Sequence, residues 1–346
     1  MCKDRKSRYI NFLRGIAIFL MLWGHSIQYS CGGQFDFFEN TVFKFIYSFH
    51  MPLFMLISGY LFRFSEQKRE MLELIEYKCK SLLYPILMCS ILNLLLSTAI
   101  VSAFRGEYDA LLGGAPITSL WFLWSVLSCS VALAFAMKLS KNHLIQILLL
   151  IVGIFFVALF PKWEKNVFMY PYFVFGYLYA GNEEKTRKLR HAGGVISSIV
   201  FIVMVFFYEK KHYIYTSGLF GGETAAETLK IDFFRWAIGL SGAVGAAWIC
   251  WLLYGVINNG KITSIFENLG QDSLAVYALS VSLLEIWLPK FADKILGILT
   301  WINWNDYIWV YNLLVTPLIA VVYSLLLLLI IKGLKKANIY RLIFGR

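Results

Sequence analysis

Long apolar runs constrain the fold of this chain more than any other feature of its sequence. Hydrophobic residues make up 59% of its 346 positions and charged residues only 15%, whereas soluble domains carry roughly 45–50% apolar residues. About ten segments are apolar and close to the length that crosses the hydrocarbon core of a bilayer. They span residues 9–28, 41–62, 78–103, 118–138, 143–160, 167–182, 192–208, 233–257, 271–289 and 307–331. The sequence therefore predicts one all-α domain, residues 1–346, built as a polytopic bundle of about ten transmembrane helices.

The distribution of lysine and arginine orients these helices in the membrane. If the N-terminus is cytoplasmic, the segments on the inner side hold 21 of the 32 basic residues, which follows the positive-inside rule. Those segments are 1–8, 63–80, 138–142, 183–191, 258–270 and the tail from Lys332. Both termini are therefore predicted to be cytoplasmic, in a multi-pass protein of the cell (inner) membrane.

Several function classes have no support in the sequence. The net charge of +11 is explained by the basic loops on the predicted inner side. These loops suit contact with membrane lipids that carry anionic head groups. The basic residues are scattered over short loops, so no nucleic-acid partner is expected. Walker, GxGxxG, HExxH, GxSxG and CxxC patterns are absent from the sequence, so nucleotide-driven transport, hydride transfer and a metal site are not expected. The hydrophilic connections are short, which places any chemistry inside the bundle or at its mouths.

The first apolar segment carries an arginine and a histidine with ten residues between them. Eleven helical steps make about three turns plus 20°, so Arg14 and His25 project from one face, roughly 16 Å apart along the axis. Asn11 and Gln28 extend the same polar line. Charges in hydrocarbon are costly and are usually kept for function. A structural interpretation competes for each residue alone, because Arg14 can extend to the head groups and His25 can bond a neighbouring helix.

A second histidine lies in the next apolar segment. His50 belongs to the run Ser48–Phe54 (SFHMPLF), in which Pro52 leaves the carbonyl of Ser48 without its helical donor and favours a kink there. Two helices joined by a short outer loop bring both histidines to the outer half of the bundle. Acidic side chains that could orient an imidazole or contact a substrate are Asp36, Glu39, Asp232 and Glu285.

These segments resemble a known family. The stretch Arg8–His25 (RYINFLRGIAIFLMLWGH) is similar to the Arg-x10-His signature of the acyltransferase-3 integral membrane acyltransferases. The run Ser48–Phe54 followed by Ile57–Phe62 (ISGYLF) is similar to the second-helix motif of that family. Weaker similarities follow in the same order at Lys78–Pro85, Leu120–Leu123 and Leu269–Tyr277, so the resemblance covers nearly the whole chain.

The resemblance implies transfer of an acyl group, most often acetyl, from cytoplasmic acyl-CoA to a hydroxyl of a cell-envelope saccharide or glycolipid. It implies catalytic roles for His25, Arg14 and His50, with His25 as general base or transient acyl carrier. Binding of acetyl-CoA, the expected co-substrate, falls to Arg14, Lys78 and Lys80, which supply cations for its phosphates. No metal is implied.

Two positions depart from the family pattern. Lys78-x-Lys80 stands where many members have Arg-x-Arg, and lysine lacks the bidentate fork that suits phosphate. Ser280 stands near the place where many members have a histidine. A third catalytic histidine is therefore not expected.

The main alternative is a secondary transporter or flippase for a saccharide or a lipid-linked saccharide, and a structural subunit is a third possibility. A transporter typically shows repeated halves with broken helices, which are not evident here, and the polar residues are concentrated in the first three segments. The acceptor sugar is not identified by the sequence. Aromatic residues predicted at the outer side that suit sugar stacking are Tyr213, Tyr215, Trp301 and Trp304.

Overall fold

The protein folds as a bundle of helices. The computed structural model describes residues 3–31, 33–103, 120–257, 260–281 and 302–345, with backbone alone at 3–4 and 96–103. Within these residues every regular element is a helix, and seven segments are long and apolar enough to cross a membrane. The predicted all-α polytopic bundle is confirmed. The predicted number of spans and the side of the termini stay predictions.

The long helices follow the predicted apolar segments. They are α1 (Lys3–Ser30), α3 (His50–Glu66), α4 (Met71–Ala103), α6 (Trp121–Lys138), α7 (His143–Val157), α8 (Trp163–Thr186), α9 (Arg190–Val205), α11 (Ala225–Ile257) and α16 (Thr316–Lys336). The shorter helices are α2 (Thr41–Tyr47), α10 (Ile214–Ser217), α12 (Lys261–Gln271), α13 (Ser273–Ser280), α15 (Ile308–Val310) and α17 (Ile339–Phe344). One turn of 3-10 helix at Arg187–Leu189 separates α8 from α9, and a π-helical turn at Tyr311–Val315 leads into α16.

The second apolar segment is broken where the sequence predicts a kink. Helix α2 ends at Tyr47 and α3 begins at His50, with Phe49 at φ −139° between them. Pro52 lies in the first turn of α3, a position where a missing N–H costs little because no helical acceptor precedes it. The break turns the segment so that Tyr47 and His50 belong to different helices that meet at one point.

The segment 258–270, predicted as an inner loop, contains helix α12, which packs along α1. A Cβ on Gly15 would lie 1.9 Å from the carbonyl oxygen of Phe266, and one on Gly270 would lie 1.8 Å from that of Asn11. Only glycine allows this approach of two backbones. The predicted span 271–289 begins as α13, and its residues 282–289 lie outside the described residues.

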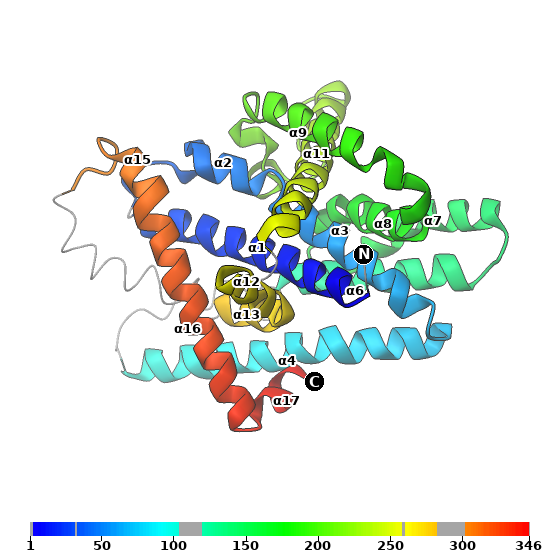
Figure 1. Ribbon diagram of the computed structural model, residues 1–346, viewed down its shortest axis with the longest axis horizontal. Helices are drawn as coiled ribbons and strands as arrows, with labels where there is room; N and C mark the ends of the chain where they lie inside the picture. Colours follow the sequence, from blue (N-terminus) through cyan, green and yellow to red (C-terminus); the bar gives the residue numbers. More distant parts are fainter. Residues whose placement is uncertain (1–2, 32, 104–119, 258–259, 282–301, 346) are drawn as a thin grey trace.

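A second pair of glycines joins α3 to α8. A Cβ on Gly59 would lie 1.9 Å from the carbonyl oxygen of Phe173, and one on Gly176 would lie 2.0 Å from that of Leu56. Figure 1 shows α1 running through the middle of the bundle, with α12 and α13 on one side and α2 and α3 on another. The two helices that carry the sequence motifs are therefore each held by a close backbone contact, α1 with α12 and α3 with α8.

The predicted orientation can be tested by cysteine labelling. Glu223 and Lys68 are exposed at chain connections, and Lys185 is exposed in the last turn of α8. A cysteine at each can therefore be introduced without disturbing packing. A membrane-impermeant maleimide added to intact cells is expected to label Glu223→Cys and to leave Lys68→Cys and Lys185→Cys unlabelled until the membrane is opened. The unsubstituted chain is the control, and labelling of either lysine position in intact cells would reverse the orientation.

Candidate active site

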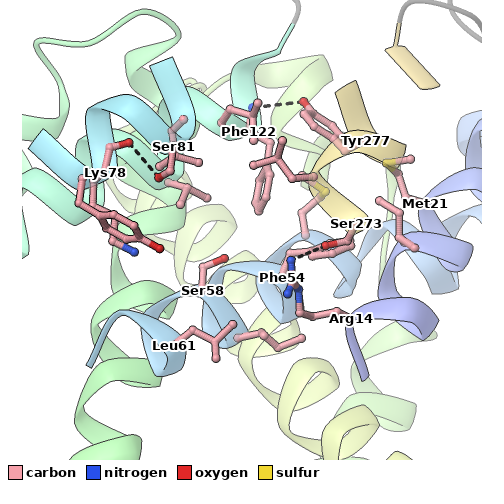
Figure 2. Close-up of a pocket in the computed structure, with 18 residues that line it drawn as sticks. Arg14, Met21, Phe54, Ser58, Leu61, Lys78, Ser81, Phe122, Ser273 and Tyr277 are labelled. Atoms are coloured by element: carbon pink, nitrogen blue, oxygen red, sulfur yellow. Dashed lines mark hydrogen bonds between the residues drawn. The ribbon is translucent and has the colours of Figure 1, made fainter. Parts of the chain in front are cut away.

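A cavity of about 140 Å³ lies between α1, α3, α4, α6 and α13. Arg14 and Lys78 line it on opposite sides, with Ser58 between them (Figure 2). A guanidinium N–H of Arg14 donates to Ser273 Oγ at 2.6 Å, which fixes the direction of the arginine side chain. The end of the cavity nearer the predicted cytoplasmic side is therefore cationic and carries hydroxyl groups, whereas its other end is apolar, with Met21, Met51 and Phe122.

The three predicted phosphate-binding residues are not brought together completely. Lys78 lines the cavity and is half-buried, with its ammonium 5.2 Å from the centre of the Phe62 ring. Lys80 is exposed and forms an ion pair with Glu76 on the outside of α4. Residues two positions apart in a helix are separated by about 200° around its axis. Lys78 and Lys80 therefore cannot both face one cavity. The structure thus places Arg14 and Lys78 at the cavity and Lys80 away from it.

Arg14 and His25 lie on one stripe of α1, as their spacing predicts. The residues of α1 that line the cavity are Arg14, Ile18 and Met21, and His25 is the next member of the same i, i+4, i+7, i+11 series. The cavity ends at Met21, one turn before His25. Met21 and Met51 are both buried, and their unbranched side chains are the most adaptable that a core can use at such a closure.

His25 is held by a tyrosine from the neighbouring helix. Its Nδ1 lies 3.3 Å from the hydroxyl of Tyr47, and that hydroxyl donates to Gln28 Oε1 at 3.5 Å. When the tyrosine proton is donated to this amide oxygen, the hydroxyl accepts the Nδ1–H of His25. This arrangement leaves Nε2 as the unprotonated nitrogen, the one that a general base requires.

His50 is buried and oriented by its own helix junction. Its Nδ1 lies 2.9 Å from the carbonyl oxygen of Ile46, and a carbonyl accepts only, so Nδ1 carries the proton. The His50 ring packs on Tyr47 with ring centres 4.7 Å apart, and the His25 ring meets the same tyrosine at 6.2 Å. The structure thus brings the two predicted histidines together around Tyr47.

Tyr47 is a site residue that the sequence motifs did not indicate. It precedes His50 by three residues, a spacing that places the two side chains on one face of a helix. Across the break at Ser48–Phe49 the two rings still pack together, and the tyrosine hydroxyl lies against α1, where it contacts His25 and Gln28. The position of the break was predictable from Pro52, but the direction in which Tyr47 would point was not.

Comparison with known proteins assigns the family of the chain. The sequence profile described as an acyltransferase domain, acyltransferase-3, matches residues 7–333. The chain belongs to the acyltransferase-3 family. Membership makes it an acyltransferase and, with its apolar helices, a multi-pass membrane protein.

Curated relatives of this acyltransferase include two proteins named nodulation protein NolL. The one from Sinorhizobium fredii is 27% identical over 283 residues, which cover 77% of this chain and 75% of the relative. The one from Mesorhizobium japonicum is 25% identical over 279 residues, which cover 77% and 74%. No solved structure matches the chain.

Three of the acidic residues predicted at the outer side of the acyltransferase have ion-pair partners. Asp36 caps the 3-10 turn Phe37–Glu39 and pairs with Lys210 at 2.6 Å, and the hydrogen bond from Lys210 lowers the pKa of its carboxyl group. Glu39 pairs with Lys44, and Asp232 pairs with Arg235. Glu285 lies outside the described residues. In the described part, each of these predicted acidic candidates is therefore paired with a basic side chain.

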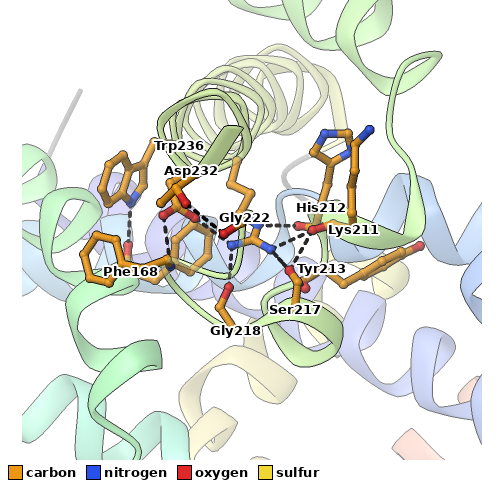
Figure 3. A network of polar contacts seen from close by, with 12 residues as sticks. Phe168, Lys211, His212, Tyr213, Ser217, Gly218, Gly222, Asp232 and Trp236 are labelled. Carbon is orange, nitrogen blue, oxygen red and sulfur yellow. Dashed lines mark hydrogen bonds and ion pairs between the residues drawn. The ribbon is translucent and has the colours of Figure 1, made fainter. Parts of the chain in front are cut away.

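Arg235 of α11 organises residues 206–224 of the acyltransferase, which are predicted to lie on the outer side and are called the outer segment below. Its guanidinium is buried and donates to the carbonyl oxygens of Lys211 (2.7 Å), His212 (3.0 Å) and Gly218 (2.7 Å), to Ser217 Oγ and to the Asp232 carboxylate. Figure 3 shows these carbonyl groups gathered around one point. Gly218 has φ +69°, which side-chain-bearing residues rarely adopt. The segment on both sides of α10 is thereby fixed to the bundle.

The outer segment also contacts the helix of the site tyrosine. Tyr213 is buried, packs its ring on Phe38 with centres 5.0 Å apart, and donates its hydroxyl to the Phe38 carbonyl at 3.1 Å. Its ring lies 5.8 Å from that of Phe43, which in turn stacks on Tyr47 at 3.8 Å. Burial lowers the pKa of His212 in this segment to about 4, so the histidine is neutral at physiological pH.

Proposed function

We propose that the chain transfers an acetyl group from cytoplasmic acetyl-CoA to a hydroxyl of a cell-envelope saccharide, across the inner membrane. The observation that carries this proposal is the cavity that begins at two cations and ends one turn from two histidines. Family membership supports acyl transfer over transport. The saccharide is supported by the resemblance of the motifs and by aromatic side chains at the outer side.

The cationic end of the cavity suits the phosphates of the donor. Arg14 can present two parallel N–H groups to a phosphate, whereas Lys78 contributes a point charge. Carrying a polyanion past the apolar residues Met21 and Phe122 would be very costly. The phosphates are therefore expected to stay near Arg14 while the thin pantetheine arm extends toward the histidines.

The proposed chemistry needs one base at the outer end. Nε2 of His25 takes the proton of the acceptor hydroxyl as its oxygen attacks the thioester carbonyl, forming the ester C–O bond. The C–S bond then breaks, and the CoA thiolate leaves and takes up the proton. In the two-step version Nε2 of His25 attacks the thioester first, and the C–S bond breaks to release the CoA thiolate. The acceptor hydroxyl then attacks the acyl-imidazole, the C–N bond breaks, and the hydroxyl proton passes to the thiolate. Tyr47 holds the His25 ring in either version, and His50 packs on the other side of that tyrosine.

Transfer can be tested with the purified full-length chain in proteoliposomes. The donor is radiolabelled acetyl-CoA, and the acceptor is envelope saccharide extracted from cells that lack the protein. Label is expected in the saccharide fraction, in an alkali-labile ester. If the chain binds acetyl-CoA and the saccharide stays unlabelled, the proposed acceptor class is wrong.

Three single substitutions test the cationic end of the cavity. Arg14→Lys keeps the charge but loses the paired N–H groups, so acetyl-CoA affinity is expected to fall about tenfold, as is typical for one charge-assisted hydrogen bond. Lys78→Met is expected to weaken the affinity to a similar extent. Lys80→Met is the matched control, because this neighbouring lysine faces away from the cavity. The measurement is calorimetric titration of the detergent-purified protein with acetyl-CoA. Equal affinities for Lys78→Met and Lys80→Met would place the donor elsewhere.

A further inference from the structure

A second, smaller cavity lies on the other side of Met51 from the candidate donor cavity. It has a volume of about 20 Å³, and its lining includes Tyr47, Ser48, Met51, Tyr213 and Tyr215. Met51 lines both cavities. A space of this size holds about one water-sized group, which is the size of a hydroxyl and much smaller than a sugar ring.

The outer edge of this cavity is an exposed aromatic ring. Tyr215 belongs to α10 and is 41% exposed, and its ring centre lies 6.2 Å from that of Tyr47 and 6.0 Å from that of Trp121. The ammonium of Lys165 lies 4.5 Å from the Tyr215 ring and 4.8 Å from the Trp121 ring. Two rings and a hydrogen-bond donor from three separate elements thus meet at one place on the outer side.

We infer that Tyr215, Trp121 and Lys165 form the subsite that binds the acceptor saccharide ring. The apolar C–H face of a pyranose stacks on the exposed Tyr215 ring, and a ring hydroxyl accepts a hydrogen bond from Lys165. A neighbouring hydroxyl enters the small cavity beside Tyr47, whose ring touches both histidines. Met51 is shared by this hydroxyl site and the donor cavity, so the two substrates approach each other at this residue.

The structure gives reasons why this ring, among the outer aromatic residues, is the binding surface. Tyr213 and Trp304, which the sequence also suggested for stacking, are buried and packed against Phe38 and Tyr311 respectively. Trp301 lies outside the described residues. Arg235 holds the residues on both sides of Tyr215, so the ring is presented in a fixed position and stays 41% exposed. Binding therefore requires little ordering of the protein.

The inference rests on the proposed transfer to a saccharide, and steady-state kinetics can test the two separately. With the envelope extract as acceptor, Tyr215→Ala is expected to raise the half-saturating acceptor concentration about tenfold, as loss of one aromatic stacking contact typically does. Tyr215→Phe keeps the ring and is expected to raise this concentration less than Tyr215→Ala does. The half-saturating acetyl-CoA concentration is expected to stay unchanged in both variants, because neither touches the donor cavity.

A second variant and a surface control complete the test. Lys165→Met keeps the apolar stem and is expected to raise the acceptor requirement several-fold, which covers the case in which Tyr215→Ala fails to fold. Tyr307→Ala removes another exposed tyrosine and is expected to leave the half-saturating concentrations of both substrates unchanged. If wild type transfers to saccharide while Tyr215→Ala and Lys165→Met keep wild-type acceptor dependence, the subsite is wrong and the proposed function stands. If wild type transfers nothing, the proposed function itself fails and the subsite falls with it.

Discussion

His25→Ala is expected to reduce acyl transfer by a factor of roughly 10²–10⁴, the usual cost of losing a positioned proton-transfer group. The loss is expected to be larger if the imidazole itself carries the acyl group. The side chain is half-buried, and its contacts in the described part of the chain include the Tyr47 hydroxyl and the rings of Tyr29 and Tyr47. The measurement is initial transfer rate from labelled acetyl-CoA in proteoliposomes that contain equal amounts of folded protein.

The design separates chemistry from donor binding. His25→Ala is expected to bind acetyl-CoA like the wild type, because the cavity cations lie more than two turns away at Arg14 and on another helix at Lys78. Tyr47→Phe is the matched variant, since it keeps the ring between the histidines and removes only the hydroxyl that holds Nδ1. A partial loss of rate is expected for it. Wild-type turnover in His25→Ala would exclude this histidine as base and as acyl carrier.

The helical stripes of the bundle could be predicted from the sequence because they depend on period alone. Arg14 and His25 lie on one face of α1 since eleven residues complete three turns. The same period explains why Lys78 lines the cavity whereas Lys80 faces away from it. That difference could have been deduced from the two-residue spacing, and the similarity of the basic pair to the family motif outweighed it.

Contacts between distant elements could not be predicted in the same way. The segment that contains α12 was predicted as a loop because it is too short to span a membrane. The position of α12 depends on close contacts at Gly15 and Gly270, which belong to two different helices. Tyr47 joins the site through contacts of its hydroxyl with His25 and Gln28 on α1. The sequence suggests Asp36 and Asp232 as site candidates, but each forms an ion pair in the structure. The partner of Asp36 is Lys210, which is far away in the sequence and could not be predicted from spacing.

The second large effect is expected from Arg235. Replacing it with methionine leaves the buried Asp232 carboxylate with the Phe220 N–H as its hydrogen-bond donor and leaves the carbonyls of Lys211 and Gly218 without the guanidinium. Removing one partner of a buried ion pair typically costs about 3–5 kcal/mol. The expected result is a marked fall in the thermal midpoint of the purified protein, measured by tryptophan fluorescence. Lys211→Met, at an exposed position of the same segment, is expected to leave the midpoint unchanged.

A double variant distinguishes the charge from the positioning role. Asp232→Leu combined with Arg235→Met removes both charges, so no buried carboxylate stays unpaired and much of the lost stability is expected to return. The carbonyls on both sides of Tyr215 still lack their donor, so the outer segment is not held. The double variant is therefore expected to keep normal acetyl-CoA affinity but to need a higher acceptor concentration than the wild type. If its acceptor dependence returns together with its stability, Arg235 serves only to pair Asp232, and the outer segment reaches its position without it.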